Sequence, residues 1–171
     1  ARLRRRCLPR SQKADDLPKF EQLYTDLQRE IHDFPSMISA MTSLTMFFED
    51  GHTNIEIPYT NEDFCLKIVC EWHGDRLVLT KSYEDFEIGT EIVAIEGMRI
   101  DKVLECMASV IPHENIYLVK SRIIEYPYMN YHLFSKMNLS RMFGDKEYYK
   151  ITFLKDDKEC KKKCRLEQYD G

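Results

Sequence analysis

This chain of 171 residues lacks any long hydrophobic run. No window approaches the roughly 18 consecutive apolar residues of a membrane-spanning helix, so no membrane span is expected. Residues 2–6 include four arginines, but no apolar stretch follows them, so they do not form an intact secretory signal peptide. The cellular location is left undetermined by these features.

The six cysteines lack the spacing of a metal site. Without a Cys-x-x-Cys pair or a Cys/His cluster, we expect no zinc, no other metal and no cofactor. Cys65 and Cys70 fall on opposite faces of a strand-like run, and Cys160 and Cys164 would lie about 13 Å apart along a strand, too far for a disulfide. Free thiols are therefore expected, which mildly favours a reducing compartment.

An excess of basic charge is also missing. The chain has 25 basic and 29 acidic residues, for a net charge of −4, whereas nucleic-acid binding requires a concentrated basic face. Two basic clusters, residues 2–6 and 161–165, are short, lack interleaved aromatics and lie near the chain ends. We interpret both as solvated segments and expect no nucleic-acid partner.

What the sequence does contain is the composition of a folded domain, with 43% hydrophobic and 12% aromatic residues. Residues 1–16 look irregular. Helices are predicted over residues 17–31 and 35–49, each with apolar residues at three- and four-residue spacing on one face. The residues that mark these faces are Phe20, Leu23, Leu27 and Ile31 in the first helix and Met37, Met41, Leu44 and Phe48 in the second.

From residue 53 onward the pattern becomes mostly β. Strands are predicted over residues 53–59, 64–72, 76–81, 91–95 and 98–100, with a final hairpin over 147–154 and 159–166. A helix is predicted over residues 101–111, with Asp101 as its N-cap, and one or two more between residues 114 and 137. This order predicts an α+β fold, in which a helical pair precedes a small, partly open β-barrel with two or more helices.

A lone histidine lies where the helical part meets the β part, in the sequence Asp50-Gly51-His52-Thr53. Gly51 suits a helix end, and a histidine fixed at such a junction can reach a cleft, where its near-neutral pKa suits proton transfer. His52 is therefore a candidate general base. The alternative is that His52 only hydrogen-bonds a helix end.

The segment Ile88-Gly89-Thr90-Glu91-Ile92-Val93-Ala94-Ile95-Glu96-Gly97-Met98-Arg99-Ile100 resembles the Gly-Asp-x-Ile-x-x-Ile-Asn-Gly-x-x-Ile signature of PDZ domains. Thr90 replaces the usual acid and Glu96 the usual Asn. A helix follows, as a PDZ ligand-groove helix would. The chain has no clear Gly-Leu-Gly-Phe-like loop of the kind that binds peptide carboxyl termini.

The order of helical region, Asp-Gly-His-Thr, β segment and PDZ-like element resembles the carboxyl-terminal processing and tricorn-type serine peptidases. The stretch Ile111-Pro112-His113-Glu114-Asn115 also resembles bacterial members. The resemblance implies a helical region (17–52) and a PDZ-like domain (53–171) that precede a catalytic domain and contact polypeptide substrate. It also implies an extracytoplasmic location, and it matches His52 to the histidine of the tricorn-type branch.

The chain itself has no serine in a Gly-x-Ser-x-Gly elbow, so we expect it to be inactive alone. Three interpretations are open. In the first, the chain is the non-catalytic N-terminal portion of a serine peptidase, and His52 joins a serine of a further domain. In the second it is a self-contained peptide-binding module, and in the third an interaction domain without a peptide groove.

Overall fold

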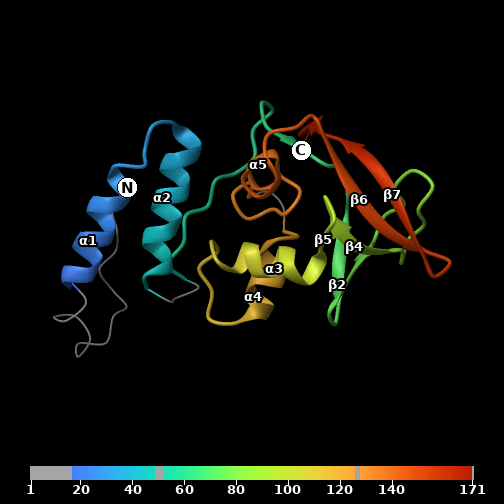
Figure 1. Cartoon of the computed structure of the whole chain (residues 1–171), viewed down its shortest axis with the longest axis horizontal. Coiled ribbons are helices and arrows are strands. Elements are labelled where there is room, and N and C mark those ends of the chain that lie inside the picture. The colour runs from blue at the N-terminus through green and yellow to red at the C-terminus, as the bar shows by residue number, and fades with distance from the viewer. Residues whose placement is uncertain (1–16, 49–51, 126–127, 171) are drawn as a thin grey trace.

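The computed structural model describes residues 17–48, 52–125 and 128–170, and these residues confirm the predicted α+β fold (Figure 1). The predicted irregular segment 1–16 lies outside the described residues. The helices that the structure describes are α1 (Leu17–Gln28), α2 (Phe34–Met46), α3 (Ile100–Ala108), α4 (Ile116–Arg122) and α5 (Lys136–Phe143). None of them is long and apolar enough to cross a membrane.

The predicted N-terminal helical pair, α1 and α2, forms, but α1 ends at Gln28, so Ile31 of its predicted face lies outside the helix and is exposed. Asp33 and Ser36 make a capping box at the start of α2, so the orphan N–H groups of its first turn are bonded. The predicted apolar face of α2 is wrong, because Met41 is 37% exposed. The buried positions are instead Ile38, Ala40, Thr42 and Thr45.

The described residues form eight strands in two sheets, a larger and a smaller group, all paired antiparallel. The larger group has the order β2-β3-β4-β6-β7, with β5 on β4, and the smaller pairs β1 with β8. The larger group is not closed into the expected partly open barrel, because β2 and β7 remain as ends. The bounds are β1 Phe64–Cys65, β2 Cys70–His73, β3 Arg76–Leu79, β4 Glu91–Ile95, β5 Met98–Arg99, β6 Tyr148–Lys155, β7 Lys158–Arg165 and β8 Glu167–Gln168.

One hydrophobic core joins the sheet to helices α3, α4 and α5, which lie to one side of it in Figure 1. Its members all lie at or after Leu66, so the α1–α2 pair contributes nothing to it. The pair has its own aromatic contacts instead, with ring centroids of Phe20, Phe47 and Phe48 5.5–5.7 Å apart. The helical pair is therefore a separate appendage in packing terms, as its position at one end of Figure 1 also shows.

The predicted strand over residues 53–59 does not form. That segment makes a single bridge, from Pro58 to Tyr128, and otherwise runs as an irregular connection. Its alternating residues Ile55, Ile57 and Tyr59 are held by side chains of a distant loop. The period of two is present in the sequence, but the hydrogen bonds of a ladder are not.

Candidate functional site

His52 lies on the surface at the start of the connection between α2 and the β part of the chain. Its side chain is exposed. The preceding residues 49–51, which include Asp50 and Gly51 of the motif, lie outside the described residues. An exposed imidazole is accessible to a group from another domain, and its role as a general base stays a prediction.

The connection that follows His52, residues 53–59, is held by hydrogen bonds to polar side chains of residues 128–138. The Ile55 N–H donates to the Tyr131 hydroxyl (3.1 Å), and the Ile57 N–H donates to Asn130 Oδ1 (3.0 Å). Asn130 Nδ2 donates in turn to the Ile55 carbonyl (2.5 Å). The Ile55 N–H and carbonyl and the Ile57 N–H are thus bonded to side chains, and of these two residues only Ile57 has a carbonyl that accepts from a backbone group, the Met129 N–H (3.0 Å), so no continuous ladder forms here.

A buried histidine lies beneath this connection. His132 is 1% exposed, and its Nδ1 lies 2.9 Å from the Tyr59 hydroxyl. Burial lowers the pKa of His132 to about 3, so the ring is neutral at physiological pH. Asn138, which is fully buried, donates through Nδ2 to the His132 carbonyl (2.8 Å). His132 therefore holds the connection in place and does not face a substrate.

The segment 88–100, which resembles the PDZ signature in sequence, includes strand β4, a turn and strand β5, and helix α3 follows from Ile100. Ile92 and Ile95 are fully buried, while Glu96 and Gly97 take positive φ values of 50° and 85°. The Glu96 carboxylate accepts hydrogen bonds from the Lys150 N–H (2.7 Å) and Lys146 Nζ (2.9 Å). Glu96, in place of the usual Asn, therefore ties the turn to β6.

Helix α3 begins one residue before the predicted N-cap. Arg99 occupies the N-cap position without a side-chain hydrogen bond, and Asp101 lies in the first turn. The prediction for Asp101 is wrong because Ile100, which is buried, continues directly from β5 into the helix. Asp101 still favours this helix, since a carboxylate in the first turn complements the helix dipole.

Strand β2 has a free edge whose hydrogen-bonding groups can be assigned from its pairing with β3. The Thr80 N–H donates to the Val69 carbonyl (2.9 Å). Antiparallel partners alternate between bonded and non-bonded pairs, so Glu71 and His73 also bond to β3. The N–H and C=O groups of Cys70 and Trp72 then point away from β3, toward the edge that pairs with no other described strand.

One end of this edge is fixed by a buried lysine of α4. Lys120 is 7% exposed, and its Nζ donates to the Gly74 carbonyl (2.8 Å) and to Asp75 Oδ1 (2.7 Å). It also lies over the Trp72 ring, 4.9 Å from the centroid. The hydrogen bond and charge of Lys120 lower the pKa of Asp75. The β2–β3 turn is thereby held against α4, a contact that no local sequence pattern indicates.

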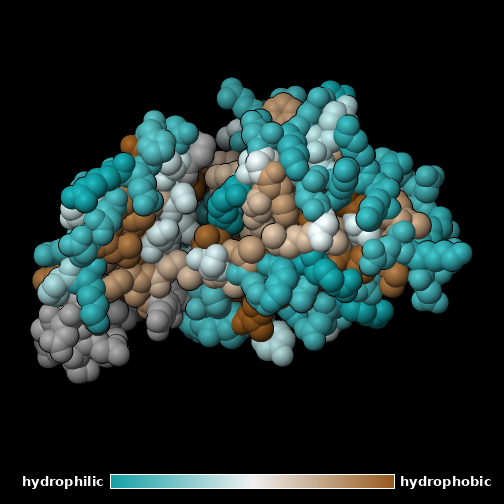
Figure 2. Space-filling view, in the orientation of Figure 1, coloured by the Kyte–Doolittle hydropathy of each residue, from teal (hydrophilic) through white to brown (hydrophobic). Residues whose placement is uncertain are grey.

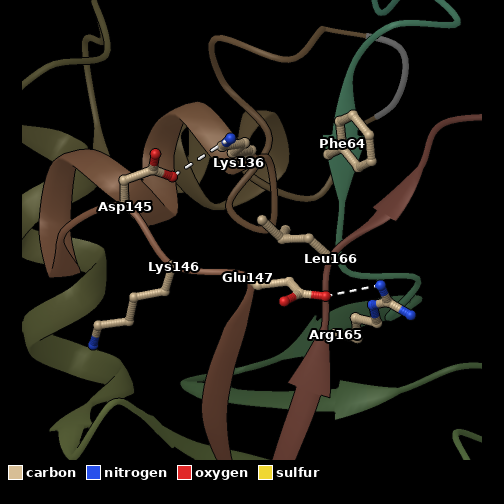
Figure 3. Close-up of a pocket in the computed structure, with 7 residues that line it drawn as sticks. All are labelled: Phe64, Lys136, Asp145, Lys146, Glu147, Arg165 and Leu166. Atoms are coloured by element: carbon tan, nitrogen blue, oxygen red, sulfur yellow. Dashed lines mark ion pairs between the residues drawn. The ribbon is translucent and has the colours of Figure 1, made fainter.

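A pocket of about 340 Å³ lies where β7 passes α5 (Figure 3). Four of its charged lining residues pair with one another, Lys136 with Asp145 at 3.5 Å and Arg165 with Glu147 at 2.8 Å, and the fifth, Lys146, pairs with Glu96 outside the pocket at 2.9 Å. Because these charges are compensated in pairs, the pocket offers no concentrated charge for a ligand.

Other reactive groups have structural roles. The described cysteines are free, and burial raises the pKa of the Cys70 thiol to about 12, so it stays protonated at neutral pH. The hydroxyls of Ser109 and Ser140 are bonded locally, to the Cys106 carbonyl (2.7 Å) and the Tyr149 hydroxyl (3.2 Å). Within the described ranges, no cluster of three or more His, Cys, Asp or Glu could hold a metal ion.

Comparison with known proteins gives no assignment: no protein-family model and no curated protein matches this chain.

Proposed function

We propose that this chain is the non-catalytic N-terminal portion of a serine peptidase of the carboxyl-terminal processing or tricorn type, and that it binds extended polypeptide substrate at the free edge of β2. The observation that carries the proposal is the β4–turn–β5–α3 element followed by helix α4, in a sheet whose strand β2 is unpaired on one side.

Strand addition requires outward backbone groups and neighbouring side chains that select the ligand. Cys70 and Trp72 supply two outward N–H and C=O pairs, as assigned above from the register. The half-buried Trp72 ring provides an apolar surface next to the edge, and Lys120, whose charge is paired with Asp75, holds the β2–β3 turn beside that ring. An extended peptide with apolar residues fits this edge.

The test is amide hydrogen exchange, followed by NMR, with a pool of extended eight-residue peptides. Binding at β2 should slow the exchange of the Cys70 and Trp72 amides at least tenfold at saturating peptide. The amides of Glu71 and His73 already bond to β3 and serve as internal controls. Peptides with N-methylated backbones should have no effect. Unchanged exchange at Cys70 and Trp72 would refute peptide binding at this edge.

The peptidase part of the proposal has a separate test in the full gene product. A serine of a further domain, activated by His52, should react with a fluorophosphonate probe. His52→Ala should abolish labelling, whereas His73→Ala, which removes another exposed histidine, should leave it unchanged. Equal labelling of the His52→Ala protein would remove His52 from the mechanism.

A stand-alone peptide-binding module is the second candidate function. It is favoured by Ser109 and Ser140, whose hydroxyls are engaged in local hydrogen bonds. It is also favoured by the β2 edge, which the β2–β3 pairing forms without His52. Slowed exchange at Cys70 and Trp72, together with no fluorophosphonate labelling of the full gene product, would select this alternative.

A further inference from the structure

The β6–β7 hairpin carries a concentration of positive charge that the net charge conceals. Residues 146–165 include eight basic and four acidic residues, whereas the chain as a whole has a net charge of −4. Figure 2 shows hydrophilic surface over the end of the molecule where this hairpin lies. Basic charge is therefore segregated onto one structural element.

The register places four of the seven basic side chains of the hairpin on one face, those of Lys150, Lys161, Lys163 and Arg165, and the other three on the opposite face. Lys150 lies directly opposite Lys163, and Tyr148 lies opposite Arg165. Since side chains alternate along a strand, these residues and Lys161 share the face opposite the buried Ile151 and Phe153. The same face also carries Thr152, which is buried, and Glu159, which pairs with Arg99. Facing lysines repel each other, so this arrangement is destabilising without an anionic partner.

The charges on this face are only partly neutralised within the molecule. Arg165 pairs with Glu147 at 2.8 Å, and Lys162, on the other face, pairs with Glu84. Among the described residues, no carboxylate lies within ion-pair distance of Lys150, Lys161 or Lys163. Three lysine ammonium groups are thus available to an external anion.

The backbone of β7 offers hydrogen bonds on the same side of the hairpin. The Lys150 N–H and carbonyl bond to Glu96 and not to β7. Lys150 and Lys163 therefore form a non-bonded pair, and by alternation Lys161, Lys163 and Arg165 direct their N–H and C=O groups to the free edge of β7.

We infer that the free edge of β7 binds an extended segment of another protein with acidic residues at alternate positions. The segment would add a strand to β7, and its acidic side chains would lie beside Lys161 and Lys163, with Lys150 on the next strand, β6, adding positive charge to the same face. Lysines on an edge strand commonly prevent another strand from pairing with it. The lysines of β7 would therefore exclude any segment that lacks acidic residues at the matching positions. A second copy of this chain is disfavoured, because β7 against β7 would bring lysines together.

The aromatic residue on this face favours protein over nucleic acid as the partner. Lys163 and Arg165 lie 4.4 and 5.8 Å from the centroid of the Tyr148 ring. A ring covered by two cations is not a free platform for base stacking, which single-strand binding uses.

The test is fluorescence anisotropy with a labelled peptide of alternating threonine and glutamate, eight residues long. It is compared with a block peptide of identical composition, in which all the threonines precede all the glutamates. We expect micromolar binding of the alternating peptide and at least tenfold weaker binding of the block peptide. The variant K150Q/K163Q removes a facing lysine pair from the face that carries Lys161 and should weaken binding at least tenfold. The matched control K155Q/K158Q removes a facing pair near the turn and should change binding less than twofold.

Amide exchange locates the peptide and separates this inference from the proposed function. Protection of Lys161 and Lys163 supports binding at β7, whereas protection of Cys70 and Trp72 alone assigns the peptide to β2 and overturns the inference. Equal binding of the alternating and block peptides, or equal weakening by both double variants, would reveal unspecific charge attraction and also overturn it. Tighter binding of an eight-nucleotide single strand would assign the face to nucleic acid instead.

Discussion

Because His132 is buried, the stability of this protein depends on pH even at pH values above those at which carboxylates titrate. Its pKa is about 3 in the folded chain, against about 6.5 in the unfolded chain. Between these values the unfolded chain binds a proton that the folded chain does not. The stability contributed by the neutral, buried His132 ring is therefore fully present above pH 6.5 and is lost as the pH falls toward 3.

The size of the effect follows from this difference. Each pH unit below 6.5 costs about 1.4 kcal/mol until the folded state also takes up the proton. At pH 5.0 the loss is about 2 kcal/mol, and it is absent at pH 7.5. Hydrogen bonds lower the pKa of the carboxyl groups of Asp33, Asp75 and Asp170, and their contributions begin only below about pH 5, nearer the ordinary aspartate pKa.

Urea unfolding at pH 7.5 and 5.0 measures this loss directly. In the His132→Gln variant an amide can still bond to the Tyr59 hydroxyl, but no proton is taken up on unfolding. The wild-type chain should lose about 2 kcal/mol more than this variant between the two pH values. His73→Gln, at an exposed position of β2, should behave as wild type. Equal losses in wild type and His132→Gln would refute the argument from burial.

Three further predictions concern the contacts that hold the candidate sites. Lys120→Met keeps the aliphatic stem but removes the bonds to the β2–β3 turn, so the free energy of unfolding should fall by about 1–3 kcal/mol. Lys102→Met, at an exposed position, is the control and should leave the free energy of unfolding nearly unchanged. Asn130→Ala leaves the Ile57 N–H and the Ile55 carbonyl without their side-chain partner. The free energy of unfolding, measured with urea, should fall by about 2 kcal/mol, and the Ile57 amide should exchange faster. Gly97→Ala introduces a side chain at positive φ and should lower stability by about 1 kcal/mol, seen as a lower thermal midpoint.

Local patterns predicted the elements whose partners lie nearby in the sequence. The β6–β7 hairpin follows from two alternating runs around Asp156-Asp157, and both residues take the positive φ that such a turn needs. The β4–β5 turn and the helix after it follow in the same way. In each case the paired strands are joined by a two-residue turn, so the local pattern is enough to indicate the element.

Patterns failed where the partners are distant. Ile57 bonds to a side chain 73 residues later in the sequence, so the alternation around it indicated a strand that does not exist. Lys120 and Asp75 are 45 residues apart, and nothing in either local sequence shows that they meet. The basic cluster 161–165 was interpreted as lacking aromatic neighbours because Tyr148 reaches it only across the hairpin.

The sheet has two open ends, and their chemistry differs enough to select different ligands. The β2 edge lies beside half-buried Trp72, whereas the β7 edge lies beside a row of exposed lysines. Desolvating those lysines without a counter-charge is unfavourable, so an apolar segment should bind only at β2. An alternating acidic segment gains ion pairs at β7 that β2 cannot supply. A substrate carrying both kinds of segment, joined by a linker that spans the sheet, would engage both edges and bind more tightly than either segment alone.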